Sequence, residues 1–241
     1  MIVKTIMKRF SHNKYRLTIF GLLAGASVVC VALVRFRAIA TGSTQYAFLI
    51  WNLFLAWIPF GIAYFTYITS IHRRWLYFIV PASALTWLIF FPNAPYILTD
   101  LQHLSYAGVD IPVWFDVILL IWFSFTGLFL GMVSLFLMQE IVRREFGHWL
   151  GWGFVLAVAG LTSIGVYMGR FLRWNSWDIL ENFSGMAQFT LYYILHPTDR
   201  SLIFASLFTS FFLFVYLILY AFGHLLLERQ GEDKAAASTV E

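Results

Sequence analysis

This chain has little charge, few prolines and a single cysteine. Charged residues make up 12% of its 241 residues, whereas a soluble globular domain carries about 25%. The lone Cys30 excludes a disulfide within the chain and a metal cluster built on cysteine. The net charge is only +4, so nucleic-acid binding has little support. The sequence also lacks the patterns of a P-loop, an HExxH zinc site, a GxSxG elbow and a GxGxxG dinucleotide turn.

What the chain has instead is apolar sequence. Hydrophobic residues make up 61% of it, and the mean hydropathy is +0.77. A membrane-spanning helix needs about 20 mostly apolar residues. Six candidate segments are residues 17–34, 46–70, 76–91, 113–138, 149–169 and 202–223. The sequence therefore predicts an all-α, polytopic membrane helix bundle with about six transmembrane helices.

Two further segments differ from these six. Residues 182–195 are weakly apolar and are interrupted by Ser184, Gly185 and Gln188, which favours a short interfacial or re-entrant helix between the last two spans. Residues 231–241 are polar and rich in small side chains, which is typical of a disordered tail. We therefore expect one integral membrane domain over residues 1–230, followed by a disordered tail over residues 231–241.

The distribution of Lys and Arg predicts the orientation of the bundle. With a cytoplasmic N-terminus, six crossings place eleven basic residues on the inner side: Lys4, Lys8, Arg9, Lys14, Arg16, Arg73, Arg74, Arg143, Arg144, Arg229 and Lys234. Five basic residues fall on the outer side: Arg35, Arg37, Arg170, Arg173 and Arg200. This bias predicts a multi-pass protein of the cell membrane whose N-terminus and C-terminus are both cytoplasmic.

Two polar, aromatic-rich stretches interrupt the apolar sequence. The first, FPNAPYILTDLQHL at residues 91–104, follows the third span on the expected outer side. Its prolines end the span, and Thr99 and Asp100 can begin a short helix. Asp100 and His103 then face the same side, as an acid–base pair or weak metal ligands. The alternative is that Asp100 caps the helix and His103 is an interfacial polar residue. Two ligands do not define a metal site, so we expect none.

The second stretch, GRFLRWNSWDIL at residues 169–180, follows the fifth span. Tryptophan at the head-group level is an ordinary membrane anchor. Arginine beside it can bind a phosphate through a bidentate fork. The stretch is therefore either an anchor or an anion site that includes Arg170, Arg173, Trp174 and Asn175. Asp178 adds a carboxylate that an anchor does not need.

Other polar residues can meet these stretches. Asn52 and Asp116 lie near the outer ends of the second and fourth spans, and polar residues within spans usually pair inside the bundle. Asp116 can therefore pair with Arg170 or Arg173. At the inner helix ends, His148 and His224 fit ordinary snorkelling. Glycines four residues apart, as at positions 127 and 131, indicate close helix packing.

The blocks NLFLAWIPF at residues 52–60, FPNAPYILTDLQHL and GRFLRWNSWDIL resemble the signature blocks of a bacterial family of integral membrane proteins, domain of unknown function 1361. The resemblance implies a multi-pass bacterial membrane protein and brings no activity or cofactor. The residues in its motifs are Asn52, Pro92, Asn93, Pro95, Tyr96, Thr99, Asp100, His103, Arg170, Arg173, Asn175 and Asp178.

Three classes of function remain open at this stage. The first is a protein that binds a lipid head group or envelope component through Asn52, Asn93, Tyr96, Arg170 and Arg173, with Trp174 and Asn175. The second is a membrane-embedded enzyme that acts on a lipid-linked substrate. Its catalytic candidates are Asp100, His103, Asp116 and Asp178. The third is a small transporter, which the near absence of charge within the spans disfavours. We expect membrane lipids as partners and no cofactor.

Overall fold

The structure is a computed structural model that describes residues 2–70, 78–106, 111–173 and 183–238. These residues form helices and short connections, with no strand among them. In chain order the helices are α1 (Ile2–Thr41), α2 (Phe48–Thr69), α4 (Ile79–Phe90), α5 (Asn93–Tyr96), the 3₁₀ helix η1 (Ile97–Tyr106), α6 (Val113–Phe146), α7 (His148–Phe171), α9 (Phe183–Leu195) and α10 (Asp199–Ser238). The all-helical class that the sequence predicts is confirmed.

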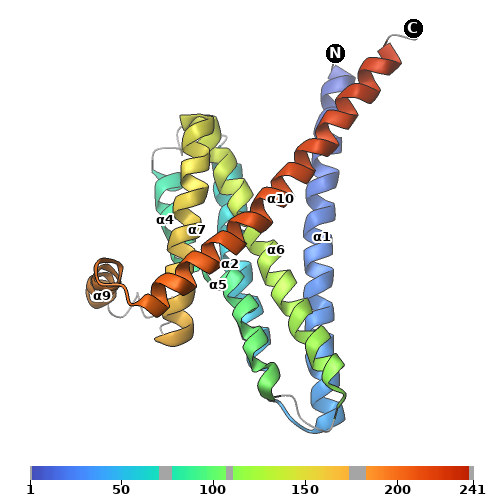
Figure 1. Cartoon of the computed structure of the whole chain (residues 1–241). Coiled ribbons are helices and arrows are strands. Elements are labelled where there is room, and N and C mark those ends of the chain that lie inside the picture. The colour runs from blue at the N-terminus through green and yellow to red at the C-terminus, as the bar shows by residue number, and fades with distance from the viewer. Residues whose placement is uncertain (1, 71–77, 107–110, 174–182, 239–241) are drawn as a thin grey trace.

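Five of the described helices are long and apolar enough to cross a membrane. They are α1 from Arg16 to Thr41, α2, α6, α7 and the part of α10 from Asp199 to Leu225. The start of α1 and the end of α10 lie at the same end of the bundle, which we call the terminal end (Figure 1). The other end, where α1 ends and α6 begins, is called the far end. These five continuous helices support a multi-pass membrane protein.

The expected third span is not one continuous helix. Over residues 76–91 the described helix is α4, with 12 residues, and residues 71–77 lie outside the described part. Pro92 and Pro95 lack the backbone N–H that would continue α4, and the chain proceeds through α5 into η1. These three elements follow one another from the level of α4 toward the far end (Figure 1). The expected third span is therefore a series of short helices, and it is not among the five helices long enough to cross a membrane.

The break is packed into the centre of the molecule. Phe91, Ala94 and Ile97 are fully buried, although the sequence placed this stretch at the outer surface. A Cβ added at Gly127 of α6 would lie 2.7 Å from the Ala94 carbonyl oxygen, and one at Gly165 of α7 would lie 2.7 Å from the Pro92 ring. Glycine is needed at both positions because α6 and α7 approach the broken segment so closely.

Two glycines also set the ends of long helices. Gly42 has a φ of 67°, which ends α1 seven residues beyond the expected last residue, Val34. Gly147 has a φ of 94° and joins α6 directly to α7. Because α1 continues to Thr41, Arg37 lies within a helix rather than in a loop.

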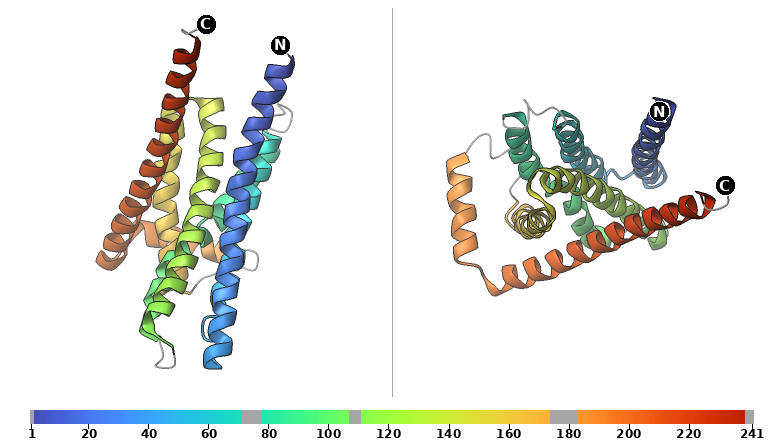
Figure 2. Two further views of the ribbon diagram at one scale, coloured as in Figure 1. Left: turned by 90° about the vertical axis from the view of Figure 1, so that its right-hand side faces the viewer. Right: turned by 90° about the horizontal axis from the view of Figure 1, so that it is seen from above.

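The last two helices differ in direction from the rest. Seen from above, α9 lies in the plane of the view, whereas α7 is seen end-on (Figure 2). This placement fits the expected interfacial helix, and Thr190 of α9 contacts the Met168 sulfur of α7. α10 runs obliquely across the bundle and packs chiefly on α7. It continues to Ser238, so residues 231–238 are helical where composition predicted a disordered tail.

Candidate functional site

A cluster of polar side chains surrounds Arg170 in the last turn of α7. The Arg170 Nε and Nη2 groups both donate to Thr99 Oγ1, at 2.9 and 2.6 Å. Nη2 also donates to Asp100 Oδ1 in an ion pair. The guanidinium carbon lies 4.3 Å from the centre of the Tyr96 ring. We call Asn52, Tyr96, Thr99, Asp100, His103 and Arg170 the Arg170 cluster.

Asp100 is the buried centre of this cluster. Its side chain is 1% exposed, and that of Arg170 is 8% exposed. Its second oxygen, Oδ2, accepts a hydrogen bond of 2.8 Å from the Asn52 amide of α2. A carboxylate buried in an apolar bundle is stable only when it is paired and hydrogen-bonded. The contacts of Asp100 therefore hold α2, η1 and α7 together.

His103 is the more accessible member of the cluster. Its side chain is 21% exposed, and Nε2 lies 3.3 Å from Arg170 Nη1 and 3.8 Å from Asp100 Oδ1. In η1, residues three apart eclipse, which brings Asp100 and His103 to the same edge. The Arg170 guanidinium contacts both side chains on that edge, so its positive charge opposes a metal ion there. In the described part of the chain, no three His, Cys, Asp or Glu side chains gather around a possible metal position.

A second buried ion pair lies at the same end of the bundle. Arg37 of α1 binds Asp116 of α6 through two hydrogen bonds, Nε to Oδ1 at 2.7 Å and Nη2 to Oδ2 at 3.1 Å. The two side chains are 3% and 0% exposed. The expected pairing of Asp116 with Arg170 or Arg173 is therefore wrong. Arg37 takes Asp116 because α1 extends far enough to bury it.

Tyr46 connects the two ion pairs. The Arg37 guanidinium carbon lies 4.4 Å from the centre of the Tyr46 ring, a cation–π contact. The Tyr46 hydroxyl donates to the His103 backbone carbonyl at 3.1 Å. Next to it, the Phe48 ring meets the His103 imidazole edge-on, with centroids 4.8 Å apart. This series of contacts from Arg37 to Arg170 thus links α1, α2, η1, α6 and α7.

Comparison with known protein families gives one match. Residues 51–223, more than two thirds of the chain, match the family described as Protein of unknown function (DUF1361). The chain belongs to the DUF1361 family. No curated protein matches this DUF1361 chain, and no solved structure matches it.

The matched region of this DUF1361 protein contains the whole Arg170 cluster, as well as Asp116. Arg37 and Tyr46 precede it. Of the other expected site residues, Asn93 donates from its amide to the Phe90 carbonyl at 2.9 Å, one turn before Tyr96. The expected residues Trp174, Asn175 and Asp178 lie outside the described residues.

Arg173 lies just past the end of α7 in the DUF1361 chain. Its side chain is exposed, and its φ of 58° places it in the left-handed region, which is unusual for a residue other than glycine. Arg173 lies two residues beyond Phe171, the last residue of α7, and three residues after Arg170. Arg170 is thus fixed inside the cluster, whereas Arg173 faces outward beside it.

Sequence reasoning missed Arg37 and Tyr46 and treated Thr99 only as a helix start. Arg37 was assigned to a loop because the apolar segment weakens after Val34. No glycine or proline lies between Val34 and Gly42, and this is the signal that could have extended α1. Thr99 is the residue that aligns the Arg170 guanidinium. It lies directly before Asp100 in the motif at residues 91–104, which also contains Tyr96 and His103.

Proposed function

We propose that this protein binds the anionic head group of a lipid, or of a lipid-linked envelope component, at the far end of its helix bundle. One observation carries the proposal. A rigid arginine, Arg170, is held in a largely buried polar cluster, and an exposed arginine, Arg173, follows three residues later. Planar guanidinium groups fit phosphate through paired hydrogen bonds.

The cluster supplies preorganisation rather than free charge. Arg170 and Asp100 neutralise each other, so the pair alone does not attract an anion. Arg173 adds a full positive charge. Thr99, Tyr96 and Asp100 already fix the side chain of Arg170. Binding of a phosphate would therefore cost Arg170 little additional side-chain entropy.

We further propose that the far end faces the outside of the cell membrane and that both chain ends are cytoplasmic. The sequence assigns eleven of the sixteen basic residues to the same side as the two chain ends. Of the five at the far end, Arg37 and Arg170 are in buried ion pairs, which leaves Arg35, Arg173 and Arg200 to oppose the bias. The ligand would then come from the outer leaflet or the envelope.

Lipid retention by purified protein tests the proposed site. The wild type, Arg173→Gln and Arg170→Lys are exchanged into nanodiscs of phosphatidylglycerol and phosphatidylcholine, and retained lipid is counted by native mass spectrometry. We expect each variant to bind phosphatidylglycerol at this site about ten-fold more weakly, since one strong charge-assisted contact is lost. Lysine keeps the charge of Arg170 but cannot donate to Thr99 and Asp100 in the same geometry.

Arg200→Gln is the matched control, because Arg200 is an exposed arginine in the first turn of α10, the helix that packs on α7. Its retention should stay within about two-fold of wild type. Equal loss in Arg173→Gln and Arg200→Gln would show that only general surface charge attracts the lipid. That result would refute a site at the Arg170 cluster.

A further inference from the structure

A second group of polar side chains lies at the terminal end, where three helices converge. α6 contributes Gln139 and Arg143, α7 contributes His148 and Trp152, and α10 contributes Tyr216 and Tyr220. Within each helix the two residues are four apart, so each pair forms a column on one face. Because sequence reasoning treated Arg143 and His148 as separate surface residues, it missed their convergence.

Direct contacts join the three columns. Tyr216 donates its hydroxyl hydrogen to Gln139 Oε1. Arg143 Nη1 donates to the Tyr220 hydroxyl at 3.4 Å, and the Trp152 and Tyr220 rings meet edge-on at 4.9 Å. Trp152 Nε1 lies 3.2 Å from His148 Nε2. The group thus runs from the buried pair of Gln139 and Tyr216, each 2% exposed, to the exposed His148.

The innermost residue has an unmet hydrogen-bonding group. Gln139 Nε2 is buried and has no hydrogen-bond partner among the described residues. A buried amide hydrogen without an acceptor is unfavourable, and polar groups at membrane depth usually serve a ligand or a partner helix. Arg143 adds to the excess of donors, although its Nη2 is ion-paired with Glu140 Oε2 at 2.7 Å, so a phosphate would use its remaining N–H groups. A guanidinium carries five N–H groups, and Glu140 and Tyr220 account for two of them in the described contacts.

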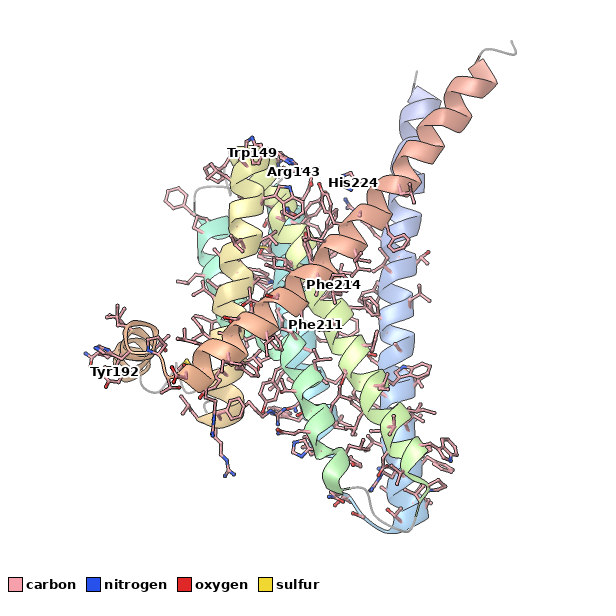
Figure 3. The ribbon with its side chains drawn as sticks, in the orientation of Figure 1. Arg143, Trp149, Tyr192, Phe211, Phe214 and His224 are labelled. Carbon is pink, nitrogen blue, oxygen red and sulfur yellow. The ribbon has the colours of Figure 1, made fainter. Side chains whose placement is uncertain are left out.

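The depth of the group is that of a lipid head group. Trp149, in the first turn of α7, is 86% exposed and lies at this end of the bundle with Arg143 and His224 (Figure 3). Exposed tryptophan is typical of the membrane–water interface. Gln139 lies one helical turn, about 6 Å, deeper than Arg143. Donors are therefore stacked from the interface inward.

From this arrangement we propose that α6, α7 and α10 form a phosphate-binding site at the terminal end, distinct from the Arg170 cluster. The phosphate binds Arg143 and His148 at the interface, and an oxygen of the same molecule accepts the hydrogen bond of Gln139 Nε2. The ligand chemistry is a phosphate ester, present either as a phospholipid head group or as a free phosphate compound.

Two variants and one matched control test this site in nanodiscs. Arg143→Gln removes the charge, and the double variant Gln139→Leu with Tyr216→Phe removes both partners of the buried hydrogen bond. Replacing both partners by apolar groups of similar size should leave thermal stability close to wild type. Arg144→Gln makes the same charge change at the next residue, whose guanidinium binds the Ser70 carbonyl and Glu145 instead.

We measure retained phosphatidylglycerol by native mass spectrometry, with and without inorganic phosphate. Both site variants should hold the phosphatidylglycerol at this site about ten-fold more weakly, so that they lose one bound lipid while the lipid at the Arg170 cluster remains, and Arg144→Gln should stay within about two-fold of wild type. Displacement by millimolar inorganic phosphate would identify the free anion as the ligand. Retention despite phosphate would identify the phospholipid. Equal losses in Arg143→Gln and Arg144→Gln, or unchanged retention in the double variant, would overturn the proposal.

Discussion

At the scale of single residues, the far end of this protein is organised by two buried Arg–Asp pairs. Arg37 with Asp116 and Arg170 with Asp100 are each 8% exposed or less. An isolated ion in such surroundings is far less stable than a paired one, so each partner depends on the other. The pairs specify which helices meet at this end, because each joins elements distant in the sequence.

The Arg37–Asp116 pair gives the first prediction. Asp116→Leu alone should lower the free energy of unfolding by about 3–5 kcal/mol, because it leaves Arg37 charged and buried. The double variant Arg37→Leu with Asp116→Leu should recover most of that loss. Unfolding in mixed micelles measures both, and Arg35→Leu, an exposed neighbour on α1, is the control. A double variant as unstable as Asp116→Leu would contradict the pairing.

Thr99 gives a second prediction at this scale. Thr99→Val preserves volume but removes the hydroxyl that accepts from Arg170 Nε and Nη2. We expect a loss of stability of about 1–3 kcal/mol and weaker retention of anionic lipid, since the guanidinium is no longer aligned. Thr86→Val is the comparison, because Thr86 is exposed on α4 and its hydroxyl donates only to its own helix at Ala82. Equal effects at both positions would remove Thr99 from the site.

Residue pairing was the part of the site that sequence reasoning predicted least well. It brought Asp100, His103, Asn52 and Arg170 into one expected site because their motifs lie at the same ends of neighbouring spans. It assigned Asp116 the wrong arginine, because the length of α1 is set by Gly42 and not by hydropathy. Composition predicts that a buried charge has a partner, but tertiary packing decides which partner that is.

At the scale of elements, the broken segment formed by α4, α5 and η1 positions the Arg170 cluster. The long helices were predictable from length and apolar composition. The break was not, because an apolar run followed by two prolines reads as the end of a span. Only close packing against glycines of α6 and α7 shows that α5 continues inside the bundle. A 3₁₀ helix as long as η1 is uncommon and is held by these neighbours.

Glycine substitutions test this packing. Gly127→Ala would place a methyl group 2.7 Å from the Ala94 carbonyl oxygen and 2.8 Å from Ile97 Cδ1. We expect a loss of stability of about 1–3 kcal/mol from overpacking, together with displacement of η1 and weaker lipid retention. Gly153→Ala, on α7, meets nothing within 4 Å and should be neutral or slightly stabilising. A neutral Gly127→Ala, measured by thermal unfolding, would show that α5 does not pack this closely.

At the scale of the whole molecule, the two polar groups lie at opposite ends of one bundle. The Arg170 cluster lies on η1 and the end of α7, whereas Arg143 lies at the end of α6, on the side of the two chain ends (Figures 1 and 3). A membrane around the bundle would therefore expose the two groups to different leaflets. Which group meets the outer leaflet depends on the orientation that the distribution of Lys and Arg predicts.

Cysteine labelling tests that orientation. Native Cys30 is fully buried, so the unmodified chain should remain unlabelled by an impermeant maleimide. Gln45→Cys, between α1 and α2, puts an exposed thiol at the far end, and Glu145→Cys puts one at the terminal end. Ser184→Cys puts an exposed thiol in α9, which the sequence assigns to the same side as position 45. In intact cells we expect labelling at positions 45 and 184 only, and at position 145 after lysis. The reverse pattern would place the Arg170 cluster in the cytoplasm and exclude an envelope ligand. Labelling at only one of positions 45 and 184 would mean that α9 and the α1–α2 turn face different sides. The bundle would then cross the membrane an odd number of times between these positions.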